Sequence, residues 1–126
     1  MSTVFTKIIN GELPSYKIYE DDIGVAFLDI NPIQKGQVIL VPYQEIDPIY
    51  NLPEVIYRRL FERAGYIAKL LEVRLKCKRV CLVVEGYEIP HAHIKLIPTN
   101  SPEDLHKEPY SASKEELEEM YKLLTP

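Results

Sequence analysis

The 126-residue sequence predicts an α+β domain in which helices pack on one face of an antiparallel sheet of five strands. Three observations lead to this fold class. Five short segments are rich in apolar and β-branched residues and are separated by turn residues. One long segment near the middle of the chain has the apolar periodicity of a helix. The connections between neighbouring strands are short, which favours antiparallel pairing because parallel strands need long crossovers.

The N-terminal part of the chain predicts one short helix followed by three strands. The helix is expected over residues 3–10, with Gly11 directly after it as a stop signal. Residues 16–20 alternate between apolar and polar side chains, as a half-buried strand does. Residues 23–29 predict a second strand. Residues 37–43 form a nearly continuous apolar run with β-branched residues, which predicts a third.

The central segment, residues 52–75, predicts the one long helix. Asn51 and Glu54 have the spacing of a capping box at its start. Apolar residues recur in this segment at spacings of three and four, which places them on one face of a helix as an apolar stripe. The members of this stripe are Ile56, Leu60, Ala64, Ile67 and Leu71.

The rest of the chain predicts two more strands and a terminal helix. The strands are expected over residues 79–85 and 91–97, and the helix over residues 113–124. Ser113 and Glu116 have capping-box spacing at the start of this helix. The predicted order is therefore helix, three strands, long helix, two strands and helix, in one domain over residues 1–126.

Composition excludes several classes of function. Hydrophobic residues make up 46% and charged residues 27%, as in an ordinary globular protein. The net charge is −4, so electrostatic binding to nucleic acid or to a membrane surface is not expected. The N-terminus lacks the apolar core of a signal peptide, and no apolar run is long enough to span a bilayer. We therefore expect a cytoplasmic protein.

The most informative segment is His91-Ala92-His93-Ile94-Lys95. On a strand, side chains alternate between faces, so His91, His93 and Lys95 are expected to share one face while Ala92 and Ile94 face the core. Three interpretations are open. The segment can be an ordinary amphipathic strand with two histidines on its wet face, or two imidazoles that share a zinc ion. In the third interpretation, a neutral imidazole attacks phosphorus while Lys95 neutralises the phosphoryl oxygens.

At this segment the sequence resembles the histidine-triad (HIT) family. HAHIKLIP is similar to the family signature, His-x-His-x-His followed by two apolar residues. Two further stretches, VFTKIINGELPSYKIYEDD and AFLDINPIQKGQVILVP, match family landmarks in the same order. The resemblance covers residues 4–98, and residues 99–126 are a C-terminal extension without a match. It implies a HIT-like five-stranded antiparallel sheet with a long central helix and a C-terminal helix.

The resemblance also implies roles for individual residues. His93 matches the middle histidine, the family's nucleophile, and His91 matches the first histidine, which helps to order the site. Asp29 and Ile30 match the pair that holds the ribose and flanks the base. The apolar positions that sandwich the base are matched by Phe5, Ile8, Leu13 and Phe27.

Three positions depart from the family pattern. Lys95 replaces the third histidine, and lysine binds phosphate as a point charge without shuttling protons. Gln37 stands where many members have a histidine near the phosphate. Glu88 stands where some members have a serine that assists the leaving group. These three residues are nevertheless expected at the nucleotide site.

The leading hypothesis is a hydrolase or nucleotidyl transferase that acts at the α-phosphate of nucleoside phosphoramidates, acyl-adenylates or dinucleoside polyphosphates. His93 would form a covalent nucleotidyl-histidine, and no metal would be required. One alternative is a purine-nucleotide-binding module with little turnover, because Lys95 replaces a histidine. A weaker alternative is a protein that binds zinc through His91 and His93. The resemblance further implies a homodimer and ligands derived from AMP or GMP.

Overall fold

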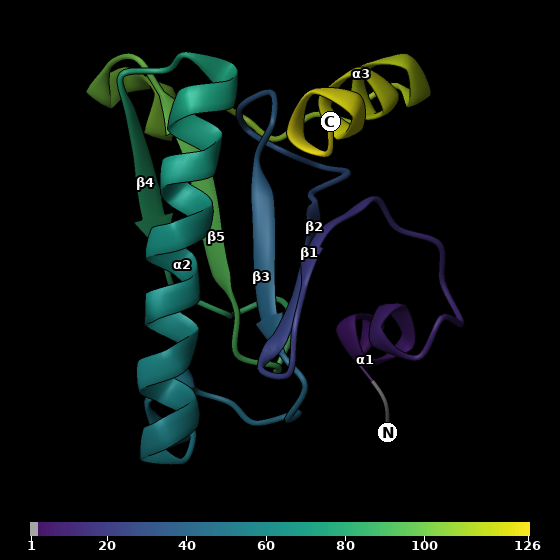
Figure 1. Cartoon of the computed structure of the whole chain (residues 1–126), viewed down its shortest axis with the longest axis vertical. Helices are drawn as coiled ribbons and strands as arrows, with labels where there is room; N and C mark the ends of the chain where they lie inside the picture. The colour runs from purple at the N-terminus through teal and green to yellow at the C-terminus, as the bar shows by residue number, and fades with distance from the viewer. Residues whose placement is uncertain (1–2) are drawn as a thin grey trace.

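The computed structural model describes residues 3–126 and contains one antiparallel sheet with strand order β1-β2-β3-β5-β4 (Figure 1). The predicted α+β class and the five-stranded sheet are confirmed. The elements are α1 (Val4–Ile9), β1 (Lys17–Glu20), β2 (Gly24–Leu28), β3 (Val38–Pro42), the 3₁₀ helix η1 (Ile49–Asn51), α2 (Glu54–Leu75), β4 (Arg79–Val83), β5 (Ile94–Thr99), the 3₁₀ helix η2 (Pro102–His106) and α3 (Lys114–Leu124).

Helix α2 runs along one face of the sheet (Figure 1). Four members of its predicted apolar stripe, Leu60, Ala64, Ile67 and Leu71, are fully buried. They share a core with side chains of the central strands, among them those of Leu40, Ile94 and Leu96. Burial of this stripe, rather than helix propensity, is the main source of stability for such a helix.

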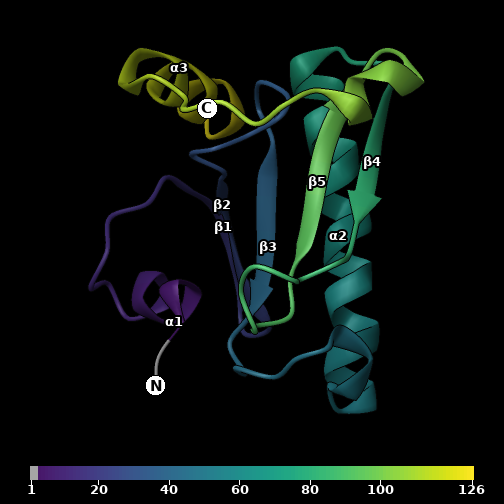
Figure 2. The same ribbon diagram turned by 180° about the vertical axis from the view of Figure 1, so that it is seen from behind.

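Helix α1 packs on the opposite face, so the expectation that all helices lie on one face is wrong. Phe5 and Ile8 form a second core cluster with apolar residues of β2 and β3, namely Val25, Phe27, Ile39 and Val41. Seen from behind, α2 lies beyond the sheet (Figure 2). The physical reason is that β2 and β3 are buried along their whole length, so both faces of these strands need apolar cover.

The last strand begins later than expected, because β5 starts at Ile94 and not at residue 91. The backbone N–H of Ala92 donates to the carbonyl of Ile46 over 2.8 Å, and Ile46 lies in the loop after β3. Residues 91–93 therefore form a loop that enters the strand. This correction decides where the two histidines point.

The two predicted capping boxes have different outcomes. The N-cap of α2 is Pro53, which makes no side-chain cap, and Asn51 ends η1 instead, so the first expectation is wrong. The hydroxyl of Ser113 accepts a hydrogen bond from the Glu116 N–H over 3.1 Å, which confirms the cap of α3.

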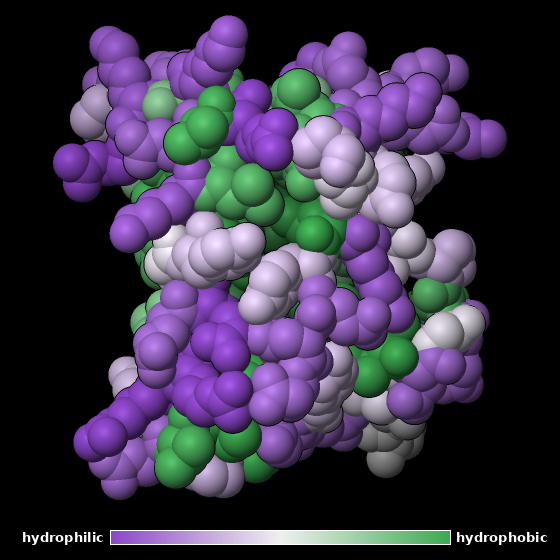
Figure 3. All heavy atoms as spheres, in the orientation of Figure 1, coloured by the Kyte–Doolittle hydropathy of each residue, from purple (hydrophilic) through white to green (hydrophobic). Residues whose placement is uncertain are grey.

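The C-terminal extension packs on the same core as α2. Leu117, Met120 and Leu124 of α3 are buried in the cluster that holds the α2 stripe. Figure 3 shows apolar side chains gathered between the upper part of α2 and α3, with hydrophilic residues on both sides. Within residues 3–126, no helix is both long enough and apolar enough to cross a membrane.

Candidate active site

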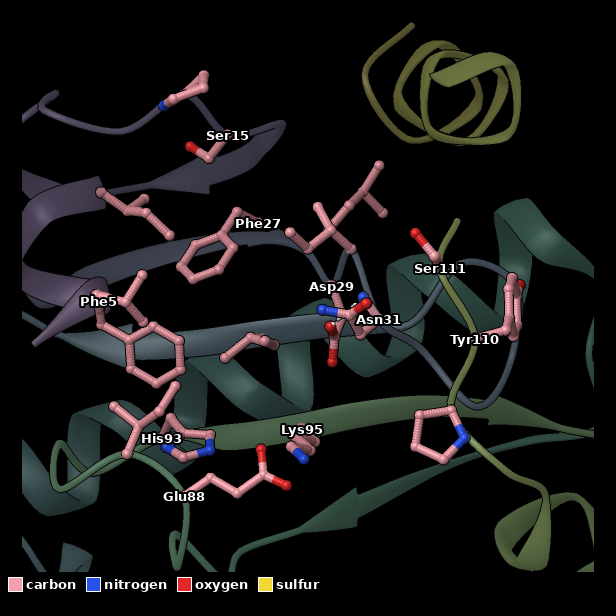
Figure 4. A pocket seen from close by; sticks show the side chains of 18 of the residues that line it. Phe5, Ser15, Phe27, Asp29, Asn31, Glu88, His93, Lys95, Tyr110 and Ser111 are labelled. Carbon is pink, nitrogen blue, oxygen red and sulfur yellow. Dashed lines mark hydrogen bonds between the residues drawn. The ribbon is translucent and has the colours of Figure 1, made fainter. Parts of the chain in front are cut away.

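A cavity of about 560 Å³ opens on the α1 side of the sheet (Figure 4). Its walls come from α1, the ends of β2 and β5, the loop after β4 and the segment before α3. Eight of the residues expected at a nucleotide site line this cavity: Phe5, Ile8, Phe27, Asp29, Ile30, Glu88, His93 and Lys95. Three expected residues, His91, Leu13 and Gln37, do not line it.

The His93 ring is held in one orientation. Its Nδ1 lies 2.8 Å from the backbone carbonyl oxygen of His91, and because a carbonyl only accepts, Nδ1 carries the proton. Nε2 is then the unprotonated nitrogen available to the cavity. The residue is 5% exposed. Burial lowers the pKa of the His93 imidazole, and the Lys95 cation adds to the lowering. The geometry thus presents a neutral imidazole nitrogen to a ligand.

His91 lies behind the cavity and not in it. Its side chain is fully buried. Nε2 donates to the carbonyl of Pro42 over 2.9 Å, which leaves Nδ1 to accept from the Thr3 hydroxyl at 3.0 Å. The expectation that His91, His93 and Lys95 share one strand face is therefore wrong, because residues 91–93 are not in strand conformation. His91 acts as a support for the loop that carries His93.

Phe5 connects α1 to both histidines. Its ring packs edge-on against His93, with ring centroids 4.8 Å apart and planes at 72°. It also contacts the His91 ring at 5.8 Å and the Phe27 ring at 5.8 Å. Edge-to-face packing of this kind fixes ring positions and excludes water. Phe5 therefore both lines the cavity and contributes to the desolvation of His93.

Lys95 and Glu88 lie on the same side of the cavity as His93. Figure 4 shows the Glu88 carboxylate between the His93 ring and the Lys95 side chain. Lys95 is half-buried on β5, and neither it nor Glu88 forms an ion pair within the described part of the chain. An ammonium without a protein counter-ion is free to bind a phosphoryl oxygen.

Asp29 follows β2 and is oriented by two donors. Its Oδ1 accepts from the backbone N–H of Asn31 at 2.9 Å, and its Oδ2 accepts from Nε2 of Gln37 at 2.8 Å. Gln37 is 2% exposed, and its Oε1 accepts from the N–H of Ile33 at 3.0 Å. Gln37 was expected near the phosphate, and this placement is wrong. Because its side chain is committed to Asp29 and to Ile33, it positions the carboxylate from behind.

The apolar residues expected around a base are only partly brought together. Phe5, Ile8 and Phe27 line one end of the cavity from α1 and β2, and Ile30 lines it with 57% of its surface exposed. Leu13 is 37% exposed in the loop after α1 and lies outside the cavity wall. An exposed wall residue such as Ile30 has surface left for a ligand to cover.

Sequence reasoning missed the part of the wall that the C-terminal extension supplies. Tyr110 and Ser111 line the cavity beside Asp29 (Figure 4). The backbone N–H of Tyr110 donates to the carbonyl of Pro32 over 3.0 Å, and the backbone N–H of Ala112 donates to the carbonyl of Ile30 over 3.0 Å. Backbone hydrogen bonds between distant segments leave no pattern in the sequence that could have shown this. Glu85 was also missed, and its charge in a loop next to the motif was the available signal.

A family model described as the HIT domain matches residues 10–102. The chain belongs to the HIT family. An uncharacterized HIT-like protein of Borreliella burgdorferi is 33% identical over 108 residues, which cover 75% of this chain and 73% of that protein. A Saccharomyces cerevisiae protein named adenosine 5′-monophosphoramidase is 30% identical over 100 residues. The matched region covers 75% of this chain and 61% of that protein.

Solved structures agree with the HIT fold. A hypothetical histidine triad nucleotide-binding protein from Sulfolobus tokodaii superposes with a TM-score of 0.86 at 25% identity, covering 97% of this chain and 89% of that chain. A HIT-like protein from Bartonella henselae gives the same TM-score at 23% identity and supports the fold alone. This HIT protein therefore belongs to a family that includes enzymes acting on nucleotides.

The hydrogen bonds of the histidines in this HIT protein argue against the alternative in which His91 and His93 share a zinc ion. Both ring nitrogens of His91 are engaged, by Pro42 and by Thr3. A zinc ion shared with His93 would have to displace both hydrogen bonds. Among residues 3–126, no cluster of three or more histidine, cysteine or acidic side chains is placed to hold a metal ion.

Proposed function

We propose that this HIT protein is a hydrolase or nucleotidyl transferase that acts at the α-phosphate of purine nucleoside 5′-phosphate derivatives through a covalent nucleotidyl-histidine on His93. One observation carries the proposal: Nδ1 of a buried, neutral imidazole is bonded to the His91 carbonyl, which leaves the Nε2 lone pair to the cavity. A buried imidazole in this state is suited to nucleophilic catalysis. The adenosine 5′-monophosphoramidases among the relatives support this reaction class.

The cavity offers separate places for the parts of a nucleotide. The base is proposed to lie against Phe5, Phe27 and the exposed side of Ile30. The ribose hydroxyls would donate to the oriented carboxylate of Asp29, since an ionised carboxylate accepts at both oxygens. The α-phosphate would then lie between His93 and Lys95.

The proposed reaction has two displacements at phosphorus. First, Nε2 of His93 forms a bond to phosphorus while the bond to the leaving group breaks, and the leaving group keeps the electron pair. An amine leaving group takes a proton from water as this bond breaks, so that it departs as the neutral amine. Second, a water oxygen attacks phosphorus, its proton passes to solvent, and the electron pair of the phosphorus–nitrogen bond returns to Nε2. Lys95 stabilises charge on the phosphoryl oxygens in both transition states.

No resident metal is proposed for these steps. The support is the donor chemistry, because His91 is committed on both nitrogens and Lys95 already supplies a cation beside His93. Dialysis against a chelator should leave turnover unchanged. Loss of turnover that returns with added zinc, together with zinc in the purified protein, would favour the zinc-binding alternative.

The covalent intermediate is the decisive test. A phosphoramidate substrate with a labelled α-phosphate should label wild-type protein in a single turnover quenched by denaturant. His93→Ala should show no label and no turnover, with nucleotide affinity within about tenfold, because a nucleophile acts mainly in the transition state. His106→Ala is the matched control, since His106 is exposed on η2 outside the cavity. Binding without label in the wild type would favour the nucleotide-binding module.

We also propose a homodimer formed through α2 and the open edge of the sheet. β4 is an edge strand within residues 3–126, and Leu82 on it is 42% exposed. Val55 and Val73 of α2 are 63% and 72% exposed. Exposed apolar side chains on neighbouring elements are typical of an interface. Sedimentation should give twice the 14.6 kDa chain mass, whereas a monomer at micromolar concentration would contradict the proposal.

A further inference from the structure

A second cavity, of about 420 Å³, lies beside the first, and His93 and Glu85 belong to the walls of both. It is bounded by the loop after β3, residues 43–53, and the loop between β4 and β5, residues 84–93. These loops lie together at one end of the sheet (Figures 1 and 2), where the Ala92 N–H donates to the Ile46 carbonyl. The second cavity is therefore built by two joined loops.

The wall of the second cavity is acidic and aromatic. Asp47 and Glu85 contribute carboxylates, and two tyrosines contribute aromatic side chains: Tyr50, a residue that is 75% exposed, and Tyr87, which is 93% exposed. Within residues 3–126, no lysine or arginine lines this cavity, and neither carboxylate forms an ion pair. The first cavity also contains three carboxylates, but Lys95 lines it as well. Among the described residues, the first cavity therefore offers a cation to an anionic group of a ligand, and the second cavity offers none.

His93, which lines both cavities, has a nitrogen that is free to contact a ligand. Its side chain is 5% exposed, and Nε2 has no hydrogen-bond partner in the described part of the chain. In the first displacement, phosphorus lies between Nε2 and the leaving group, and the nucleoside is attached to the same phosphorus. If the nucleoside occupies the first cavity, the second cavity, which shares two wall residues with the first, is the adjoining space that remains for the leaving group.

From this geometry we infer that the second cavity is a leaving-group subsite that selects an organic cation, namely an amine that carries a further ammonium group. The inference rests on the proposed function. Asp47 and Glu85 attract an ammonium and repel a phosphate or carboxylate. Tyr50 and Tyr87 line the same cavity, and a tyrosine ring can add a cation–π contact to a bound ammonium. Dinucleoside polyphosphates, whose leaving groups are anionic, are accordingly poor substrates.

Three adenosine phosphoramidates of equal length test this inference. Their leaving amines are diaminobutane, butylamine and aminobutyrate, whose free ends are cationic, neutral and anionic. In wild type at low salt, kcat/KM should fall in that order, with about tenfold or more between the first and the last, since a pair of partly exposed charges has effects of this size. The ratio should shrink as salt rises because exposed charges are screened.

Paired variants locate the effect. Asp47→Asn combined with Glu85→Gln should reduce the ratio of kcat/KM between the cationic and the anionic substrate to about threefold or less. Glu72→Gln is the matched control, because Glu72 is an exposed glutamate of α2 outside both cavities, and it should keep the wild-type ratio. If the double variant does not fold, Asp47→Asn alone, at a carboxylate that lines only the second cavity, should reduce the ratio in part. An unchanged ratio in the folded double variant, or a salt-independent one in wild type, overturns the inference.

Affinity separates this inference from the proposed function. The dissociation constants of the three phosphoramidates are measured by calorimetry with His93→Ala, which is expected to bind them without turnover. If wild type turns over none of them but the affinities keep the predicted order, the proposed reaction fails and the cation subsite stands. If wild type turns over all three with equal efficiency and equal affinity, the reaction stands and the cation subsite is wrong.

Discussion

Nδ1 of His93 donates to the backbone carbonyl of His91 over 2.8 Å, so the loop held by one histidine sets the tautomer of the other. His91 is in turn held by Pro42 and Thr3. The two histidines of the motif therefore have different roles: His91 is a buried support, and His93 carries the reactive nitrogen. It also makes the reactivity of His93 dependent on contacts that lie outside the cavity.

The protonation state of His93 predicts the acid limb of the pH–rate profile. Burial, with help from Lys95, lowers the pKa of this imidazole from its ordinary value of about 6.5. The neutral form is the nucleophile, so activity is lost as pH falls through the lowered pKa, and the wild-type midpoint should lie below pH 6.5. The measurement is log(kcat/KM) against pH on one phosphoramidate. A midpoint at or above 6.5 would contradict this account.

Lys95 is predicted to stabilise the phosphoryl oxygens. Lys95→Ala should lose about 3 kcal/mol of transition-state stabilisation, the usual size for one such group. The acid limb of the pH–rate profile of Lys95→Ala should move to higher pH, because the cation that helps to lower the pKa of His93 is gone. Lys95→His should keep activity and gain a step between about pH 6 and 8, where an imidazole loses its charge.

The control for Lys95 is Lys69→Ala, which removes an exposed lysine of α2 outside the cavity. It should reproduce the wild-type rate and pH profile. Superimposable profiles for wild type, Lys95→Ala and Lys95→His would mean that Lys95 does not contact the phosphate.

Asp29 and its support Gln37 are predicted to act together on the ribose. Asp29→Asn should weaken binding of AMP, since an amide replaces one acceptor oxygen with a donor. Gln37→Leu should weaken it as well, because Oδ2 of Asp29 loses its partner at 2.8 Å and the carboxylate is no longer held. We expect about tenfold for each, the size of one charge-assisted hydrogen bond, measured by calorimetry.

Dideoxyadenosine monophosphate is the control ligand for these two variants. It lacks both hydroxyls, so its affinity should be insensitive to Asp29→Asn and to Gln37→Leu. An equal loss for AMP and for the dideoxy ligand would show that the variants disturb the cavity in general and that the ribose contact is wrong.

Thr3 is predicted to link the stability of α1 to catalysis. Its hydroxyl accepts from the Thr6 N–H at 3.2 Å as the N-cap of α1 and donates to Nδ1 of His91. Thr3→Val should lower the free energy of unfolding by about 1–3 kcal/mol and should also lower kcat several-fold, because α1 loses its N-cap and Nδ1 of the buried His91 loses its partner at 3.0 Å. Urea denaturation and steady-state kinetics measure the two effects.

Ser113→Ala is the matched variant for Thr3→Val, since Ser113 caps α3 through the Glu116 N–H and does not line the cavity. It should cost about 1 kcal/mol of stability and leave kcat unchanged. If both variants lower kcat alike, the effect of Thr3 is one of general stability and not of support for His91.

Local sequence patterns were enough for most of the fold. The stripe through Leu60, Ala64, Ile67 and Leu71 predicted α2, and alternation or apolar runs predicted all five strands, because these periodicities follow directly from helix and strand geometry. The N-terminal end of β5 was misplaced, since the period of two continues through residues 91–93 although the Ala92 N–H bonds to the Ile46 carbonyl and not to a neighbouring strand.

The sequence by itself determined the family resemblance, the sheet and the residue types that can react with or bind a nucleotide. Only the tertiary structure decided which of them meet: His93 and Lys95 line the cavity, His91 lies behind it, and Gln37 is paired with Asp29. The contribution of Tyr110 was likewise decided in three dimensions. The physical reason is that chain periodicity specifies which face a side chain takes within one element, whereas hydrogen bonds between distant loops specify where that element ends and what its residues touch.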